Sequence, residues 1–505
     1  MLAGLLALSL AALAGLLVRV ALDGGHLGGA EGFVAVDQLQ YLNWIRQAGD
    51  HLAVENLYDL APGPRGFVHP LVIPSGLLSA LGAGPAVAYL VWKPVAVVAL
   101  FAGALLYARR LVPATGDRRL AVCLALFMAS PVSVVGWTGV LSSERELELD
   151  FLTGELWTGT YLWGYPFTAI AVGLVPLGLL AYERGRSTGG GRWLALAAGA
   201  GLLCSWLQPW QGATLALTLV AAELVVGRGA PLAAARRLAP TLAATAAPLV
   251  YYLILSLSDA SWERAGVAND VGLFSAGALV AGLAPLALPA ALGARRAPAD
   301  FAGTALVAWP LAALAVYLQP AGTFPAHALQ GVALPLAVLG VLWLRGVLGE
   351  RALPVALVAA LALLLVAGTA YRADRLRGAV ESGFQPYFLT GGERDALAHL
   401  RDADEEGGVL APYYSGQLVP AHTGRETFVG ARSWTPDFDE RREAAERLFR
   451  GELDPAAAEA AVRASGARYL LSDCQGRAPI GADVRAFTDP PRRFGCATVY
   501  RVRPR

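Results

Sequence analysis

A single acidic residue stands out in the first long polar stretch of the chain. Asp37 ends the sequence GFVAVD and precedes a segment in which Tyr41, Trp44 and Ile45 are spaced as in a helix at a membrane surface. A carboxylate can accept the proton of an attacking hydroxyl group, which suits general-base catalysis. Asp is also a common N-cap of helices, so a structural role is the alternative.

Two further acids, Glu144 and Asp150, lie in a second polar stretch and are followed by Trp157, Tyr161 and Trp163. One interpretation is a solvated acidic face beside an interfacial belt of aromatic side chains. The other is a platform on which an acceptor sugar stacks, with Glu144 or Asp150 supplying a second catalytic carboxylate. The sequence leaves both interpretations open.

Several side chains that could hold a phosphate group border apolar segments. They are Lys93, which is the only lysine, His327 and Gln330 at the start of one apolar segment, and Arg372 just after the last one. Cations and N–H donors bind phosphate oxygens through charge-assisted hydrogen bonds. Lys93 could instead reach toward the interface as a snorkelling cation, and Arg372 could be plain surface charge.

Polar side chains also interrupt a long apolar stretch at Gln208, Trp210 and Gln211. Irregular backbone at membrane depth is tolerated only where it lines a cavity or packs within protein. Together with Tyr41 and His69 of the first polar stretch, these three residues are our candidates for contact with substrate.

The elements that must position these residues are membrane spans. Of the 505 residues, 56% are hydrophobic and 16% are charged, against roughly a quarter charged in soluble domains. A span needs about 20 mostly apolar residues. About eleven segments qualify, although the fifth and sixth could form one broken helix: 1–22, 86–108, 119–140, 164–182, 193–207, 209–227, 238–257, 271–293, 301–318, 328–345 and 353–371.

The arginines of the connecting loops alternate between the two sides of the membrane. Every second loop carries two or more of them, whereas the intervening short loops hold only Arg145 and Arg264. Because basic residues stay on the cytoplasmic side, we expect a multi-pass protein of the cell membrane with a cytoplasmic N-terminus. The segments expected outside are 23–85, 141–163, 258–270, 319–327 and the tail after residue 371.

Residues 372–505 differ in kind from residues 1–371, which we expect to form the transmembrane domain. The tail mixes both charges and contains two apolar stretches typical of buried strands, 408–411 and 468–471, with helices predicted over 437–453 and 454–465. Cys474 and Cys496 could form a disulfide in an oxidising compartment. The predicted fold class is thus an α-helical polytopic membrane protein with a small extracytoplasmic C-terminal α/β domain.

This architecture resembles the GT-C superfamily of integral membrane glycosyltransferases, and the stretches that carry the resemblance are similar to actinobacterial proteins of that type. These stretches are 37–41, 69–70, 92–94, 206–211, 323–331 and 420–425. The resemblance implies a polyprenyl-phosphate-linked sugar as donor and a cavity lined in part by Thr423 to Arg425. Many members carry adjacent acids, whereas Gln38 and Leu39 follow Asp37 here, so no metal ligand is assigned.

The function we expect is transfer of that sugar, with inversion, to an envelope glycan or protein at the outer face of the membrane, with Asp37 as general base. We expect no organic cofactor, although a divalent cation is an alternative, and the net charge of +1 gives no reason to expect a nucleic-acid partner. No Walker motif or dinucleotide fingerprint is present. The competing hypotheses are a transporter or flippase of lipid-linked precursors, which would also need many spans, and an envelope scaffold.

Overall fold

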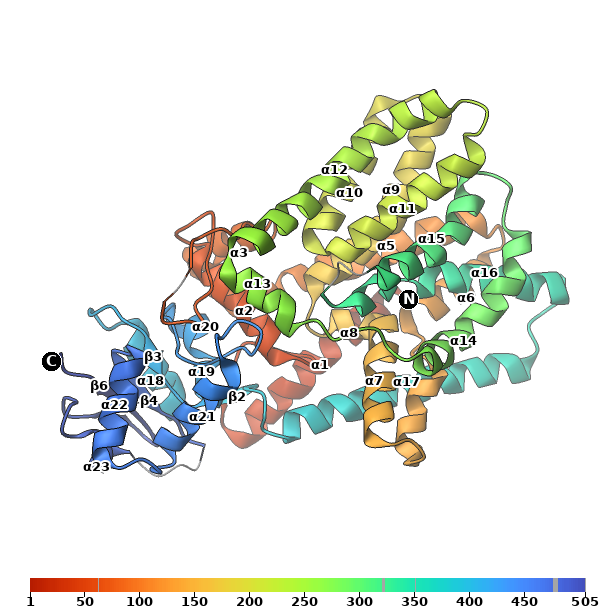
Figure 1. The fold of residues 1–505 in the computed structure, drawn as a ribbon. Coiled ribbons are helices and arrows are strands. Elements are labelled where there is room, and N and C mark those ends of the chain that lie inside the picture. Colours follow the sequence, from red (N-terminus) through yellow and green to blue (C-terminus); the bar gives the residue numbers. More distant parts are fainter. Residues whose placement is uncertain (62, 320–322, 350, 476–479, 505) are drawn as a thin grey trace. The chain divides into compact units, whose positions relative to one another are not determined.

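The structure of the chain is a computed structural model that describes residues 1–61, 63–319, 323–349, 351–475 and 480–504 (Figure 1). The chain forms two compact units. The helical unit comprises Met1–Ala11, Trp92–Leu253 and Asp270–Leu376. The mixed unit comprises Ala12–Val91, Ile254–Asn269 and Arg377–Arg505. The division predicted at residue 371 stays a prediction.

Close packing of long apolar helices holds the helical unit together. Helix α5 (Trp92–Leu111) packs along α9 (Pro166–Thr188), where a Cβ atom on Gly103 would lie 2.6 Å from the carbonyl oxygen of Gly173. Small residues let membrane helices approach this closely. The other long helices are α6 (Thr115–Phe127), α10 (Gly191–Leu207), α11 (Pro209–Val226), α12 (Pro231–Ser258), α14 (Ala276–Gly293), α15 (Phe301–Leu318), α16 (Ala333–Leu348) and α17 (Val355–Glu381).

Eight of the described helices are long and apolar enough to cross a membrane, α1 (Leu2–Asp23) among them. The bent pair formed by α6 and η2 (Pro131–Thr138) would make a ninth span. The two remaining expected spans correspond to α10 and α16, which have only 17 and 16 residues. The prediction of a polytopic helical membrane protein is confirmed, and among the described residues eight or nine of the about eleven predicted spans coincide with helices of full span length.

Helices α10 and α11 are separate helices rather than one broken span. Gln208 between them has extended backbone angles, and a Cβ atom on Gly212 would lie 2.6 Å from the Cα atom of Ser205. Seven residues along one continuous helix would place these positions about 10 Å apart. The chain therefore turns tightly at Gln208.

Short helices lie at the ends of the spans in the helical unit. The second polar stretch, expected as a loop, forms α7 (Ser143–Leu156) and α8 (Thr158–Leu162). A 3-10 helix, Pro325–Leu329, precedes α16. The expected outer loop 319–327 lies in part outside the described residues.

The first polar stretch belongs to the mixed unit and is largely helical. It contains α2 (Ala35–Gln47), α3 (Val72–Leu78) with the π-helical turn Ser79–Ala83, and α4 (Pro85–Leu90). Strand β1 (His26–Leu27) pairs antiparallel with β2 (Phe388–Leu389) of the tail. The same unit contains α13 (Ala260–Ala268), which follows α12 in the chain.

The tail contains a four-stranded sheet in the order β3-β4-β6-β5. Strands β3 (Val409–Leu410) and β4 (Tyr469–Ser472) are parallel, and β4 pairs antiparallel with β6 (Ala497–Arg501), which in turn pairs with β5 (Arg492–Phe494). The core between this sheet and helices α21 (Phe438–Phe449) and α22 (Pro455–Ser465) includes Leu410, Leu448, Phe449, Val462 and Leu470. Both predicted strands and both predicted helices of the tail are confirmed.

Local signals account for two further features of the tail. Asp454 caps α22 by accepting a hydrogen bond from the backbone N–H of Ala457 at 2.8 Å, and Pro455 occupies the first helical position. Cys474 and Cys496 are joined in a disulfide, with Cα atoms 5.2 Å apart. The predicted proximity of the two cysteines is confirmed.

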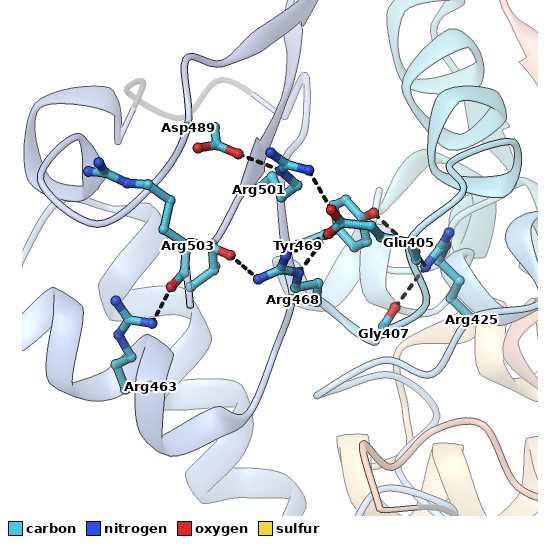
Figure 2. Close-up of polar contacts among 10 residues, drawn as sticks. Glu405, Gly407, Arg425, Arg463, Arg468, Tyr469, Asp489, Arg501 and Arg503 are labelled. Atoms are coloured by element: carbon cyan, nitrogen blue, oxygen red, sulfur yellow. Dashed lines mark hydrogen bonds and ion pairs between the residues drawn. The ribbon is translucent and has the colours of Figure 1, made fainter. Parts of the chain in front are cut away.

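Arg425 has a structural role in the tail (Figure 2). Its guanidinium stacks over the ring of Tyr469 and donates hydrogen bonds of 2.5 to 3.0 Å to the backbone carbonyls of Leu400, Ala403, Glu405 and Gly407. The carboxylate of Glu405 in turn accepts from Arg468 and Arg501 at 2.6 Å each. Arg425 therefore fastens a backbone loop instead of lining a cavity as the resemblance implied.

Candidate active site

Asp37 is exposed and lies inside the first turn of α2. The helix begins at Ala35, and the N-cap position is occupied by Val34, whose side chain makes no capping bond. The interpretation of Asp37 as an N-cap is therefore wrong. A carboxylate in the first helical turn is stabilised by the positive end of the helix dipole, and the exposed position leaves it accessible to a reactant.

Tyr41, one turn beyond Asp37 on the same helix, belongs to an aromatic wall. Its ring stacks on Tyr89 at 5.6 Å and meets the edges of Trp44 at 5.6 Å and His69 at 6.5 Å. Burial raises the pKa of Tyr41 well above its usual value, and the nearby charge of Asp37 raises it further. The phenol therefore stays protonated and can donate a hydrogen bond to a ligand.

The side chain of His69 is buried and accepts hydrogen bonds from the backbone at the start of α3. Its Nδ1 atom accepts from the backbone N–H groups of Leu71 and Val72 at 3.3 Å each. Burial lowers the pKa of His69 to about 3, so the ring is neutral at physiological pH. His69 thus orders the segment facing Tyr41, and its contact with substrate stays a prediction.

In the helical unit, residues from three separate segments form a hydrogen-bonded cluster around one carboxylate. Gln330 donates from Nε2 to Oε2 of Glu155 at 2.6 Å, and Nδ1 of His327 lies 3.1 Å from the same oxygen. Gln208 donates to Oε1 of Gln330 at 3.0 Å, and Gln211 donates to the carbonyl oxygen of His327 at 2.8 Å. We call these five residues the Glu155 cluster.

The sequence predicted four residues of this cluster separately, but it did not predict Glu155, the residue at its centre. Trp210, also predicted, packs edge-on against the His327 ring at a centroid distance of 5.0 Å. Glu155 is only 8% exposed, although it lies in a segment interpreted as an outer loop. The available signal was a lone acid in the apolar sequence FLTGELW, a pattern that often marks a functional residue.

Asp150 and Arg372 form an ion pair near this cluster. Nη1 of Arg372 donates to Oδ1 of Asp150 at 2.8 Å, and Nη2 donates to the backbone oxygen of Asp150 and to the hydroxyl of Thr153. The Arg372 side chain is 3% exposed, so it is not surface charge. In the described structure its Nε atom is buried without a hydrogen-bond partner. Glu144, the other predicted acid of α7, is exposed.

Lys93 is 2% exposed and donates from Nζ to the carbonyl oxygen of Leu162, at the end of α8, at 2.6 Å. The interpretation of a snorkelling side chain is therefore wrong, because the amine is enclosed in protein. A buried ammonium group at a helix end is shielded from water, so its positive charge is available to an anionic ligand. Its contact with a phosphate stays a prediction.

The aromatic residues of the second polar stretch are part of the protein core. Trp157, Tyr161 and Trp163 are 0%, 1% and 2% exposed. They form neither the expected interfacial belt nor a platform for an acceptor sugar, because their faces are covered. Trp157 between α7 and α8, Tyr161 on α8 and Trp163 directly after α8 instead anchor the segment that carries Glu155.

Metal-binding side chains do not gather in the described structure. Among residues 1–61, 63–319, 323–349, 351–475 and 480–504, no group of three or more His, Cys, Asp or Glu side chains could hold a metal ion. The residues present therefore give a divalent cation no evident set of ligands.

Comparisons with known proteins bear on the fold. No protein-family model and no curated protein matches the chain by sequence. An oligosaccharyltransferase from Archaeoglobus fulgidus, crystallised with Zn and sulfate, matches at 15% identity and a TM-score of 0.50, over 89% of this chain and 64% of the archaeal one. This chain shares the fold of that archaeal membrane enzyme.

Two other matches are weaker. Another structure of the Archaeoglobus fulgidus enzyme, with an inhibitory peptide and a dolichol-phosphate, gives 13% identity and a TM-score of 0.48 over 89% of this chain and 66% of that one. ArnT from Cupriavidus metallidurans, bound to undecaprenyl phosphate, gives 13% identity and a TM-score of 0.46 over 97% of this chain and 96% of that one. The chain spans about two thirds of the length of the archaeal chains that it matches.

Proposed function

We propose that this protein is an inverting glycosyltransferase that moves a sugar from a polyprenyl-phosphate carrier to an envelope acceptor at the outer face of the membrane. The observation that carries the proposal is a buried cluster in which His327 and Gln330 contact the carboxylate of Glu155 and Gln208 donates to Gln330. A polar cluster at the ends of apolar helices is costly to build, which favours a site for a polar ligand. In a chain with the GT-C fold, a lipid-linked sugar fits this description.

The phosphate of the donor would be held by Lys93, His327, Gln330 and Arg372. When His327 donates from Nδ1 to Glu155, its Nε2 atom remains available for a ligand. The buried Nε atom of Arg372 and the buried Oε1 atom of Gln211 have no partner in the described structure. Leaving a buried polar atom unpaired costs about 1–3 kcal/mol. A phosphate oxygen of the headgroup would accept from Nε of Arg372, and a sugar hydroxyl would donate to Oε1 of Gln211.

In the proposed reaction Asp37 accepts the proton of the acceptor hydroxyl as its oxygen attacks the anomeric carbon of the donor sugar. The new glycosidic bond forms as the bond to the phosphate oxygen breaks, and the phosphate leaves with the electron pair. One displacement of this kind inverts the anomeric centre. Tyr41 and His69 would border the substrate beside Asp37, and Glu144 and Asp150 remain candidates for a second acid.

The direct test is turnover by the purified, full-length protein. It would be reconstituted in vesicles with labelled polyprenyl-phosphate sugars and with acceptors extracted from the envelope. We expect the label to move to the acceptor and unglycosylated polyprenyl phosphate to accumulate. Movement of intact donor between leaflets without cleavage would contradict the proposal and favour a flippase.

A further inference from the structure

A groove in the mixed unit lies apart from the residues proposed above for catalysis. It encloses about 520 Å³, within the usual range of small-molecule pockets. One wall comes from α13 and the other from the turn-rich segment 432–438 before and into α21. We call it the α13 groove, and its lining residues are Glu263, Arg264, Val267, Ala268, Arg432, Ser433, Thr435 and Phe438.

Aromatic packing fixes the two walls relative to each other. Trp262 precedes the lining residues of α13, and Trp434 lies between two lining residues of the opposite wall. The rings of Trp262 and Trp434 meet edge to face at 5.1 Å, and Trp44 of α2 stacks on Trp262 at 6.1 Å and 8°. Rigid aromatic contacts of this kind hold a pocket in its binding shape before a ligand arrives.

The polar side chains of the groove have hydrogen-bonding capacity to spare. Nη2 of Arg264 donates to the hydroxyl of Ser261 at 3.2 Å and lies 3.7 Å from Asp59, whereas its buried Nε atom has no partner in the described structure. Arg432 contacts Asp439 at 3.8 Å, and both side chains of that pair are about 70% exposed. A long, exposed pair such as Arg432–Asp439 contributes little stability, so Arg432 can bind a competing ligand, and the unpaired Nε atom of Arg264 can donate to one.

The combination of groups is that of a sugar-binding surface. Sugar hydroxyls both donate and accept, and the groove offers the carboxylate of Glu263 beside guanidinium donors and the hydroxyls of Ser433 and Thr435. Val267 and Phe438 add apolar surface for the C–H faces of a sugar ring. An extended peptide would favour a free strand edge, whereas the described walls of this groove are a helix and turns.

We propose that the α13 groove binds the sugar chain of the acceptor, so that the acceptor is a glycan and not a protein. The proposal rests on the proposed function and specifies its acceptor. Trp44, which supports the groove, lies seven residues after Asp37 on α2, a rise of about 10 Å. A bound glycan of a few sugar units is long enough to extend from the groove toward that carboxylate.

The test measures acceptor binding and acceptor kinetics on the full-length protein. The probes are a fluorescent oligosaccharide pool, released by mild acid from the envelope of cells that make the protein, and a tryptic peptide pool from the same envelope. The variants are Glu263→Gln and Arg432→Ala, and the matched control is Arg447→Ala, which removes an exposed arginine of α21 outside the groove.

We expect the oligosaccharide pool to bind and each groove variant to weaken its binding roughly tenfold or more, with a matching rise in acceptor KM and little change in kcat. The control should behave as the original protein. Binding of the peptide pool with the same dependence on Glu263 and Arg432, or oligosaccharide binding that ignores both variants, would overturn the proposal.

The binding arm also separates this proposal from the proposed function. If no sugar transfer is detected but oligosaccharide binding still depends on Glu263 and Arg432, the groove is a glycan site and the proposed chemistry is wrong. If transfer occurs and neither groove variant changes the acceptor KM, the proposed chemistry holds and the groove proposal fails.

Discussion

Gln330 donates from its side-chain amide to the carboxylate of Glu155 across 2.6 Å, joining two residues that are 175 positions apart in the sequence. Gln330 precedes α16, and Glu155 lies one residue before the end of α7. Both side chains are nearly buried, at 5% and 8% exposure. A hydrogen bond between a charged and a neutral group in such surroundings is stronger than the same bond in water. It therefore holds both side chains in place.

Glu155→Gln removes the charge and keeps the shape. If Glu155 orients His327 and Gln330 for the donor headgroup, loss of a charge-assisted bond of about 1.5–3 kcal/mol should weaken donor binding by up to roughly 10- to 150-fold. The measurement is the donor KM in the transfer assay. Glu148→Gln on the same helix is the control, because its partner Ser275 can still donate to a glutamine. Unchanged donor KM in Glu155→Gln would show that the cluster is structural.

Asp37→Asn preserves the side-chain volume and removes the proton acceptor. We expect turnover to fall by a factor on the order of 100 to 10,000, while expression and the melting temperature hold because Asn keeps the shape and a hydrogen-bond acceptor of Asp. Asp50→Asn, at an exposed acid of the same polar stretch, should leave turnover unchanged. Near-normal transfer by Asp37→Asn would move the role of general base to Glu144 or Asp150.

Arg372→Ala leaves the carboxylate of Asp150 without its nearest partner. Breaking a buried ion pair from one side costs about 3–5 kcal/mol, so the melting temperature in detergent should drop clearly. Adding Asp150→Ala should recover part of the loss, because it removes a carboxylate that keeps only the longer contact of 3.4 Å with Arg375. Arg19→Ala is the control, since the pair of Arg19 with Asp23 is 46% and 62% exposed and should contribute about 0–1 kcal/mol. Additive losses in the double variant would contradict the pairing.

His69 predicts a dependence of stability on acidity. Its pKa is depressed to about 3 in the folded protein, against about 6.5 unfolded. Above the unfolded pKa the two states bind the same number of protons, and as pH falls below it the unfolded state gains one and stability is lost. His69→Asn keeps an acceptor for the N–H groups of Leu71 and Val72. In this variant the melting temperature should depend less on pH between about pH 6.5 and pH 4.

The comparison for that experiment is His51→Asn, which replaces an exposed histidine of the same polar stretch. The melting temperature of this variant should fall in acid as much as that of the original protein. An equal flattening in both variants would show that His69 is not the group responsible.

The orientation of the chain gives the last prediction. A reporter enzyme that works only after export, fused after residue 505, should be active, because the arginines of alternate loops place the tail outside. Mass spectrometry of the same unreduced protein should find Cys474 linked to Cys496. Activity of a reporter that works only in the cytoplasm, or two free thiols, would reverse the proposed topology.

Local patterns of residues determine much of this protein. The long apolar segments decide where helices run, because hydrocarbon forces every backbone group into a helical hydrogen bond. Asp454 and Pro455 set the start of α22, since a cap and a helix-compatible φ angle act within one turn. Polar residues such as Gln208 and His327 are identifiable as candidates because they stand out against apolar neighbours.

Only the tertiary structure decided which of those candidates belong together. Gln208 and Gln330 are 122 residues apart and meet through the packing of different helices. Sequence periodicity carries no information on such contacts, because it reports which face of a helix is buried and not what lies against it. Glu155 was missed for the same reason, since its segment reads as a polar loop, whereas packing against α17 and the Pro325–Leu329 turn makes it a buried helix.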